Sequence, residues 1–153
     1  MMSHSYKVTS HSRATPAAVF SLLVRGGTWP SWSPLDAAGL EGGGNPDEPQ
    51  TVGDVRVFRT GRSVSREPIV ELVADRRFVY ENVSGPFRFY RGVVELAEAP
   101  QGGTDITWSA TFAPKVPLTG RLLRRYLTGF MQRMADGLAE YAGRSDSGPR
   151  PGV

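Results

Sequence analysis

Two residues on one expected strand, Arg88 and Tyr90, have side chains suited to act on a bound molecule. They lie two positions apart in the segment 87–98, and the period-two alternation of a strand places both on the same face. Val94 and Leu96 share that face and favour it as the inner one. An inward guanidinium needs a carboxylate partner, a place at a cavity mouth, or an anionic or enolate oxygen of a ligand, because an unpaired buried charge is costly.

The assignment of the two faces stays open, because Phe87, Phe89 and Val93 form a second apolar set on this strand. A rim arginine that meets solvent is the alternative interpretation of Arg88. The hydroxyl of Tyr90, like that of Tyr80, either donates to a ligand carbonyl or pairs with backbone while its ring is buried. The candidates for a catalytic role are therefore Arg88 and Tyr90.

The composition argues against cysteine-based and metal-based sites and singles out no acid/base pair. The chain of 153 residues contains no cysteine, which removes disulfides, thiolate catalysis and cysteine-ligated metal centres. Its two histidines, His4 and His11, have no neighbouring Asp, Glu or His at ligand spacing, so we expect no metal site and no cofactor. Acidic residues that could form an acid/base pair are spread over strands and turns, and none is singled out: Glu67, Glu71, Asp75 and Glu81.

The last long segment, residues 118–142, predicts a helix with one buried stripe. It follows the breakers Pro114 and Pro117, and its apolar residues recur at spacings of three and four. The stripe consists of Leu123, Tyr126, Leu127, Phe130, Met134, Leu138 and Tyr141. The arginines beside it, Arg124, Arg125 and Arg133, are expected to be solvated.

Most of the chain before this helix predicts short strands. They are expected near residues 6–13, 35–40, 53–60, 63–73, 76–83, 87–98 and 104–113. After the first strand, Thr15 is a good N-cap and Pro16 a good first residue for a short helix that runs to about Val24. Residues 29–34 predict a second short helical turn. The cleanest strand places four apolar residues on one face: Ile106, Trp108, Ala110 and Phe112.

The chain-wide properties indicate one domain over residues 1–143, followed by a disordered tail over 144–153 that has little to bury. The net charge is only +3, and no aromatic-plus-basic nucleic-acid motif is present. The start of the chain lacks the apolar core of a signal peptide, and no apolar run approaches the length of a membrane span. We therefore expect a cytoplasmic monomer or homodimer that binds no nucleic acid and has no integral membrane segment.

Several segments resemble a known family. Residues 14–20 and 29–34 look like the opening signature of the polyketide cyclase/dehydrase and lipid-transport superfamily, which is also called START-like, SRPBCC or birch-pollen-allergen-like. Residues 85–96 and 103–108 are similar to its later hairpin. The resemblance covers roughly residues 5–142, and its motifs specify a fold better than a function.

This resemblance implies an α+β helix-grip fold. A curved antiparallel sheet of about seven strands would wrap the C-terminal helix, and two short helices would close one end. Between sheet and helix the family typically has a deep apolar cavity, although the same side chains could instead fill a solid core. The candidate ligand-binding residues are Phe58, Tyr80, Arg88, Tyr90, Trp108, Phe112, Phe130 and Met134.

Three classes of function stay open, because members of this family include carriers, enzymes and interaction modules. The leading hypothesis is binding of a hydrophobic or aromatic small molecule of lipid, polyketide or isoprenoid type in the internal cavity. One alternative is an aromatase/cyclase or dehydratase-type enzyme, in which Arg88 or Tyr90 polarises a carbonyl or delivers a proton. The other is a co-chaperone-like protein-interaction module that uses the outer sheet face or the basic helix.

Overall fold

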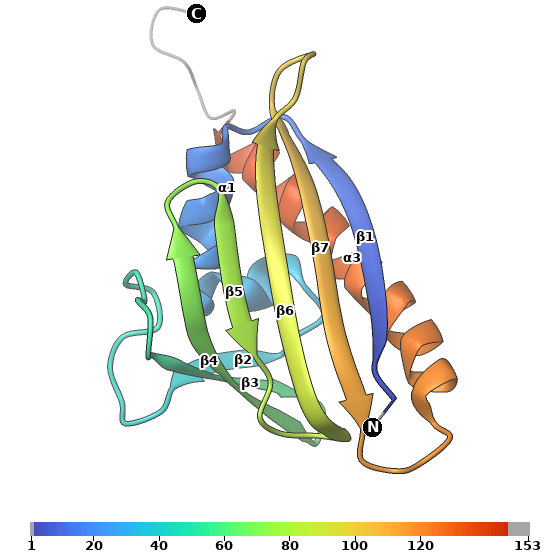
Figure 1. Cartoon of the computed structure of the whole chain (residues 1–153). Coiled ribbons are helices and arrows are strands. Elements are labelled where there is room, and N and C mark those ends of the chain that lie inside the picture. The colour runs from blue at the N-terminus through green and yellow to red at the C-terminus, as the bar shows by residue number, and fades with distance from the viewer. Residues whose placement is uncertain (1, 147–153) are drawn as a thin grey trace, which may run out of the picture.

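A seven-stranded antiparallel sheet and one long helix form the molecule, as seen in a computed structural model that describes residues 2–146 (Figure 1). The strand order is β1-β7-β6-β5-β4-β3-β2. The strands are β1 (His4–Ser12), β2 (Ala37–Leu40), β3 (Val55–Thr60), β4 (Ser63–Val73), β5 (Arg77–Glu81), β6 (Phe87–Glu98) and β7 (Thr104–Pro114). The helices are α1 (Pro16–Leu23), η1 (Gly26–Thr28), α2 (Trp29–Trp32) and α3 (Gly120–Asp146). The predicted α+β helix-grip fold is confirmed.

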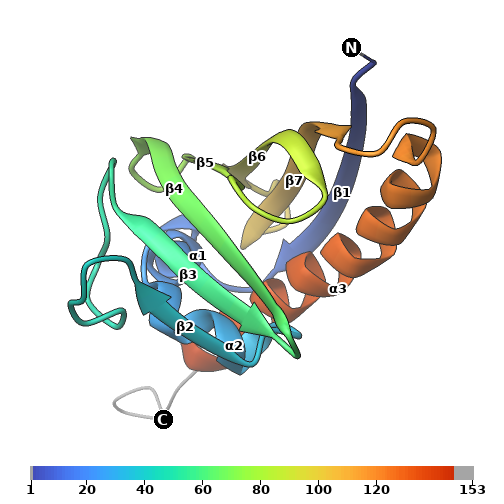
Figure 2. The same ribbon diagram turned by 90° about the horizontal axis from the view of Figure 1, so that it is seen from below.

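The sheet is strongly curved and holds α3 against its inner face. Seen from below, it bends from β1, which lies along α3, round to β2, which lies beside α2 (Figure 2). Two irregularities in register, between Ile69 and Glu71 on β4 and between Phe87 and Phe89 on β6, accompany this bend. Bulges of this kind increase local twist and bend a strand, which helps a sheet to wrap a helix.

The buried stripe of α3 follows the predicted period for most of its length. Leu127, Met134 and Leu138 are buried, whereas Phe130 is only partly buried. Tyr126 was expected in the stripe, but it is 62% exposed and stacks on Phe130 at the surface. The helix turns its Leu127 side toward the sheet at this level, which leaves the neighbouring position 126 facing outward.

The two short helices close one end of the curved sheet. Thr15 caps α1 as predicted, since its hydroxyl accepts a hydrogen bond from the Ala18 amide at 3.2 Å. Trp29 of α2 is fully buried, and its indole donates to the Leu23 carbonyl at the end of α1 at 3.1 Å. This bond, together with ring contacts to Phe58 and Trp108, fastens α1 and α2 to the sheet.

One predicted orientation on β6 is wrong. Tyr90 and Gly92 face inward as expected, but Arg88 is exposed and Phe87 is buried in its place. The cause is the register shift next to β7, where Phe87 pairs with Pro114 and Phe89 with Ala113. Two steps along β6 therefore match one step along β7, so the simple alternation fails at Arg88.

The C-terminal helix α3 extends further than the sequence predicted. The domain was expected to end at residue 143, but α3 continues to Asp146. The rest of the predicted tail, 147–153, lies outside the described residues. None of the helices in residues 2–146 is long and apolar enough to span a membrane.

The close contact between α3 and α2 can be tested at Gly137. A methyl group there would overlap the backbone carbonyl oxygen of Trp32, whereas Gly129 in the same helix has open space around it. We expect Gly137→Ala to lower the free energy of unfolding by about 1–3 kcal/mol through overpacking. Gly129→Ala should instead raise it by up to about 1 kcal/mol, because alanine favours helix. Urea unfolding measures both, and equal stabilities of the two variants would contradict the packing described.

Candidate functional site

A cavity of about 350 Å³ lies between the inner face of the sheet and α3. Its walls come from β3, β4, β5 and β6, from the segment 82–86, from Trp29 and Leu35, and from α3. Apolar side chains supply most of the lining. The α3 side consists of Leu123, Tyr126, Leu127, Phe130, Met131 and Met134.

A larger depression of about 920 Å³ lies elsewhere, between α1 and the ends of β4, β5 and β6. Much of its rim is charged: Asp75, Arg76, Arg77, Glu95 and Glu98. Arg77 is already paired with Glu71 and Glu95. A groove rimmed by charges suits an apolar ligand poorly, so we place the candidate site in the mostly apolar cavity between the sheet and α3 despite its smaller volume.

The sequence-based candidates fall into three groups in the structure. Five of them line the cavity: Phe58, Tyr80, Tyr90, Phe130 and Met134. Trp108 and Phe112 are fully buried on β7 and belong to the core behind the lining. Arg88 lies outside the cavity, in an exposed surface hollow with His4 and Lys115.

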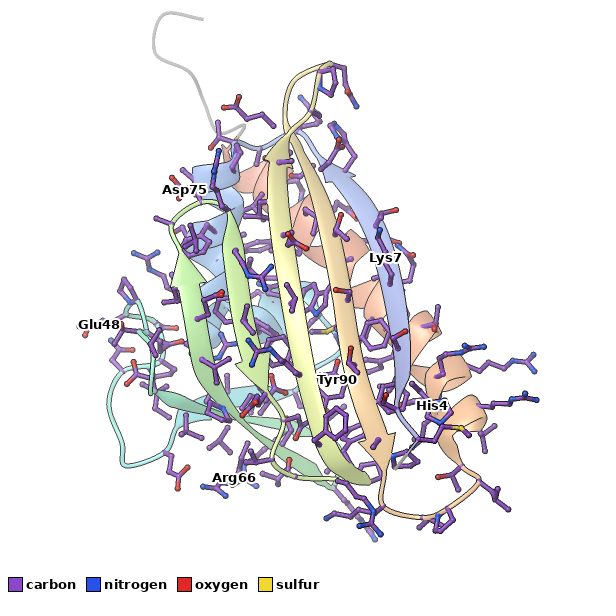
Figure 3. The ribbon with its side chains drawn as sticks, in the orientation of Figure 1. His4, Lys7, Glu48, Arg66, Asp75 and Tyr90 are labelled. Carbon is purple, nitrogen blue, oxygen red and sulfur yellow. The ribbon has the colours of Figure 1, made fainter. Side chains whose placement is uncertain are left out.

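A chain of three buried phenols includes two residues that line the cavity, Tyr80 and Tyr90. The hydroxyls of Tyr6 on β1 and Tyr90 on β6 are hydrogen-bonded, and the hydroxyl of Tyr80 on β5 lies 3.5 Å from that of Tyr90. The indole of Trp108 donates to the Tyr80 oxygen at 3.0 Å. Figure 3 locates Tyr90 in the lower part of β6, while labelled surface residues such as Lys7 and Arg66 lie at the periphery. Three strands thus contribute to one hydroxyl network.

These phenols stay protonated across the neutral range. Burial is the main reason why the pKa of each is raised: Tyr6, Tyr80 and Tyr90. For Tyr80, the nearby carboxyl of Glu67 adds to the increase in pKa. The network therefore offers neutral hydroxyl groups to a ligand.

The cavity wall also carries one carboxyl group, that of Glu67 on β4. The residue as a whole is partly exposed, but its Oε1 is buried and has no hydrogen-bond partner within residues 2–146. Its Oε2 accepts a hydrogen bond from the Ser65 hydroxyl at 3.1 Å. Burial raises the pKa of Glu67 to about 7, although the charge of Arg56 and the Ser65 hydrogen bond act in the opposite direction.

Arg56 on β3 lies behind this wall, fully buried. It is the register partner of Glu67, but no ion pair joins the two in the described part of the chain. Its Nη1 donates to the Leu23 carbonyl at 2.7 Å. The guanidinium carbon lies 4.3 Å from the ring centre of Trp29 and also over the rings of Phe58 and Phe78. Burial lowers the pKa of Arg56 to about 10, so it remains charged at neutral pH.

Sequence reasoning missed Tyr6 and Arg56, and it named Glu67 without singling it out. Strand alternation contained a usable signal for two of them. Arg56 shares a face with Phe58, and Glu67 shares a face with the buried Ile69. Nothing in the sequence pairs Tyr6 with Tyr90, because 84 residues separate them along the chain.

No metal-binding cluster appears in residues 2–146, since no three His, Asp or Glu side chains there are placed to share an ion. His11 instead pairs with Asp105 across β1 and β7, at 3.0 Å.

Comparison with known proteins matches residues 3–143 to the family model described as polyketide cyclase / dehydrase and lipid transport. A START superfamily protein from Mycobacterium smegmatis has a similar structure, with a TM-score of 0.73 at 13% identity over 89% of this chain and 94% of that one. A protein from Thermobifida fusca reaches 0.74 at 27% identity, over 92% and 93%. XoxI from Bacillus cereus reaches 0.68 at 20% identity, over 91% and 94%. No curated protein sequence matches this chain.

The raised pKa of Glu67 predicts a pH dependence of stability. The folded chain holds the Glu67 proton more tightly than the unfolded chain, so this contribution is fully present below the ordinary carboxyl pKa. It is lost as the pH rises through about 7. Relative to Glu67→Gln, the wild type should lose at most about 3 kcal/mol of unfolding free energy between pH 5 and 8. Urea unfolding of both proteins across this range measures the difference; parallel pH profiles would contradict the burial of the carboxyl.

A second prediction concerns the position of Tyr80. Gly92 on β6 is opposite Tyr80, and a methyl group at Gly92 would overlap the Tyr80 ring. We expect Gly92→Ala to displace this ring, weaken the Trp108 hydrogen bond and cost about 1–3 kcal/mol of stability. Near-ultraviolet circular dichroism and urea unfolding report both effects. Gly39→Ala on β2, where the added methyl meets nothing, is the matched control.

Proposed function

This chain belongs to the polyketide cyclase / dehydrase and lipid transport family, and from that premise we propose that it binds a hydrophobic or aromatic small molecule in its internal cavity. Lipid, polyketide and isoprenoid compounds are the classes that suit such a lining. The observation that carries the proposal is the cavity of about 350 Å³ between sheet and α3, lined mainly by apolar side chains.

The physical basis is the transfer of apolar ligand surface out of water. Each Å² of apolar surface removed from water contributes roughly 25 cal/mol, before the costs of association are subtracted. Met131 and Met134 provide flexible thioethers on the α3 wall, which can adapt to ligands of different shape. Tyr80, Tyr90 and Glu67 then supply the few polar contacts that orient the ligand.

The exposed residues of the cavity lining indicate where a ligand could enter. Tyr126 is largely exposed and Leu123 and Phe130 are partly exposed, yet all three line the cavity. Val64 and Pro86 also line the cavity and are exposed. We therefore propose that ligands enter between the first turns of α3 and the segments around residues 64 and 86.

A second candidate function uses the same cavity for catalysis, in an aromatase/cyclase or dehydratase-type reaction. The observation that favours it is Glu67, because a carboxyl with a pKa near 7 can serve as a general acid or base at neutral pH. Tyr90 remains a candidate through its hydroxyl, whereas the exposed Arg88 does not reach the cavity. Turnover of a poly-β-ketone substrate that is unchanged in both Glu67→Gln and Tyr90→Phe would contradict this candidate.

Ligand binding is tested by filling the cavity. Met131 is buried on α3 and faces the cavity, so Met131→Trp should occupy it and weaken binding of the neutral dye N-phenylnaphthylamine by at least about tenfold. Dye fluorescence titration gives the affinity and the stoichiometry, which should be one to one in the wild type. Lipids, isoprenoid alcohols and aromatic compounds can then be ranked by displacement of the dye.

The matched control places the same ring on the same helix but outside the cavity. Leu122 is 73% exposed and does not line the cavity, so Leu122→Trp should leave dye affinity unchanged. Leu123→Trp is a second blocking variant in case Met131→Trp does not fold. Full dye affinity in folded blocking variants would overturn the proposal.

A further inference from the structure

The hydroxyl of Tyr80 is the most weakly held phenol of the network that also lines the cavity. Tyr6 and Tyr90 share a hydrogen bond, whereas the oxygens of Tyr80 and Tyr90 are 3.5 Å apart. Tyr6 and Tyr80 interact as well. Trp108 donates to the Tyr80 oxygen and so leaves the hydroxyl hydrogen of Tyr80 unused. Because Tyr80 lines the cavity, its hydroxyl can turn to donate a hydrogen bond to a ligand.

The carboxyl of Glu67, in contrast, lacks a hydrogen-bond donor for one of its oxygens. Its Oε2 accepts a hydrogen bond from Ser65, whereas Oε1 is buried and has no hydrogen-bond partner in residues 2–146. The same holds for Nε and Nη2 of Arg56, the register partner of Glu67 on β3. A buried polar atom without a partner is costly, and native structures contain few of them. A group that donates a hydrogen bond to Oε1 would therefore be bound favourably.

The two features are neighbours on the same face of the sheet. Ile69 on β4 is the register partner of Tyr80 on β5, and Glu67 lies two residues from Ile69 on the same strand. Glu67 is consequently a diagonal neighbour of Tyr80, at a separation that one ligand group can bridge. The opposite wall, formed by Leu127, Met131 and Met134 of α3, is apolar.

We propose that Glu67 and Tyr80 form a polar subsite that recognises the hydroxyl group of an otherwise apolar, neutral ligand. A phenol or alcohol oxygen accepts a hydrogen bond from the Tyr80 hydroxyl and donates its own hydrogen to the Glu67 carboxylate. The rest of the molecule lies against the apolar wall of α3. This inference rests on the proposed function, and it narrows the ligand class to phenols and apolar alcohols.

The charges that face Glu67 oppose ionic ligand ends. On β3, Arg56 holds its positive charge between aromatic rings, which disfavours a second cation close by. A ligand carboxylate would instead face the carboxylate of Glu67 itself. On β5 and β1 the neighbours are the neutral phenols of Tyr80 and Tyr6, and on β4 the neighbour is the Ser65 hydroxyl. These neighbours therefore favour a ligand whose polar end is a neutral hydroxyl group.

The test compares three ligands of nearly equal size by calorimetric titration. 2-Naphthol donates and accepts, 2-methoxynaphthalene only accepts, and 2-methylnaphthalene does neither. The wild type should bind 2-naphthol about tenfold more tightly than 2-methylnaphthalene, because a hydrogen bond to a charged group increases affinity by about this factor. In Glu67→Leu and in Tyr80→Phe this preference should fall to about threefold or less, with 2-methylnaphthalene affinity retained. Glu71→Leu, on the same strand but outside the cavity, should keep the full preference.

The pH dependence of the ligand preference provides an independent test. The carboxyl of Glu67 is an acceptor when charged and a donor when protonated, and burial raises its pKa to about 7. The preference for 2-naphthol over 2-methoxynaphthalene should therefore increase severalfold from about pH 5.5 to about pH 8, since only the charged form requires a donor. Glu67→Gln, which keeps an amide oxygen, should retain part of the preference but lose its pH dependence.

The outcomes separate this inference from the proposed function. Equal affinities for the three ligands in the wild type, or an equal loss for all three in Glu67→Leu, would overturn the hydroxyl subsite while leaving cavity binding intact. Absence of binding for all three, together with no dye binding, would overturn both. Loss of the 2-naphthol preference in Glu67→Leu and Tyr80→Phe, with Glu71→Leu unchanged, supports the subsite.

Discussion

The guanidinium of Arg56 lies fully buried where α1, α2, β3 and β5 meet. A charge in such a position must be stabilised from several sides, because isolated charges are very costly in apolar surroundings. The Leu23 carbonyl at the C-terminus of α1 supplies a hydrogen bond with favourable dipole direction, and the faces of Trp29 and Phe78 supply cation–π contacts. Nε and Nη2 of Arg56 have no hydrogen-bond partner in residues 2–146, so the charge depends on these few contacts, which join α1, α2, β3 and β5.

The cavity depends on this arrangement. Trp29 and Phe58 contact Arg56 and also line the cavity, so the same rings that stabilise the charge form the boundary of the ligand site. The electric field of Arg56 reaches Glu67 and limits how far burial raises the pKa of its carboxyl. The buried charge at the closed end of the fold thereby opposes the effect of burial on the pKa of Glu67, the carboxyl that lines the cavity.

Much of the fold could be predicted from the sequence because its signals are local. The alternation of Ile106, Trp108, Ala110 and Phe112 identified a strand with one buried face, and all four are buried on β7. Thr15 and Pro16 marked the start of α1 correctly. The prediction for Arg88 failed because a bulge depends on how β6 pairs with β7, and one shifted residue moves a side chain to the other face. Tyr126 failed for a related reason, since the rotation of α3 about its axis is set by what it packs against.

The sequence by itself determined the family, the order of strands and helices, and the aromatic character of the inner face, because each of these follows from residue type and period. The tertiary structure alone decided which polar groups meet in the cavity. Tyr6 and Tyr90 come together only because β1 and β6 both pair with β7, and Glu67 comes beside Tyr80 only through the register of β4 and β5. Strand register is a property of the assembled sheet, and it places Glu67 and Tyr80 at the cavity while Arg88 lies outside it.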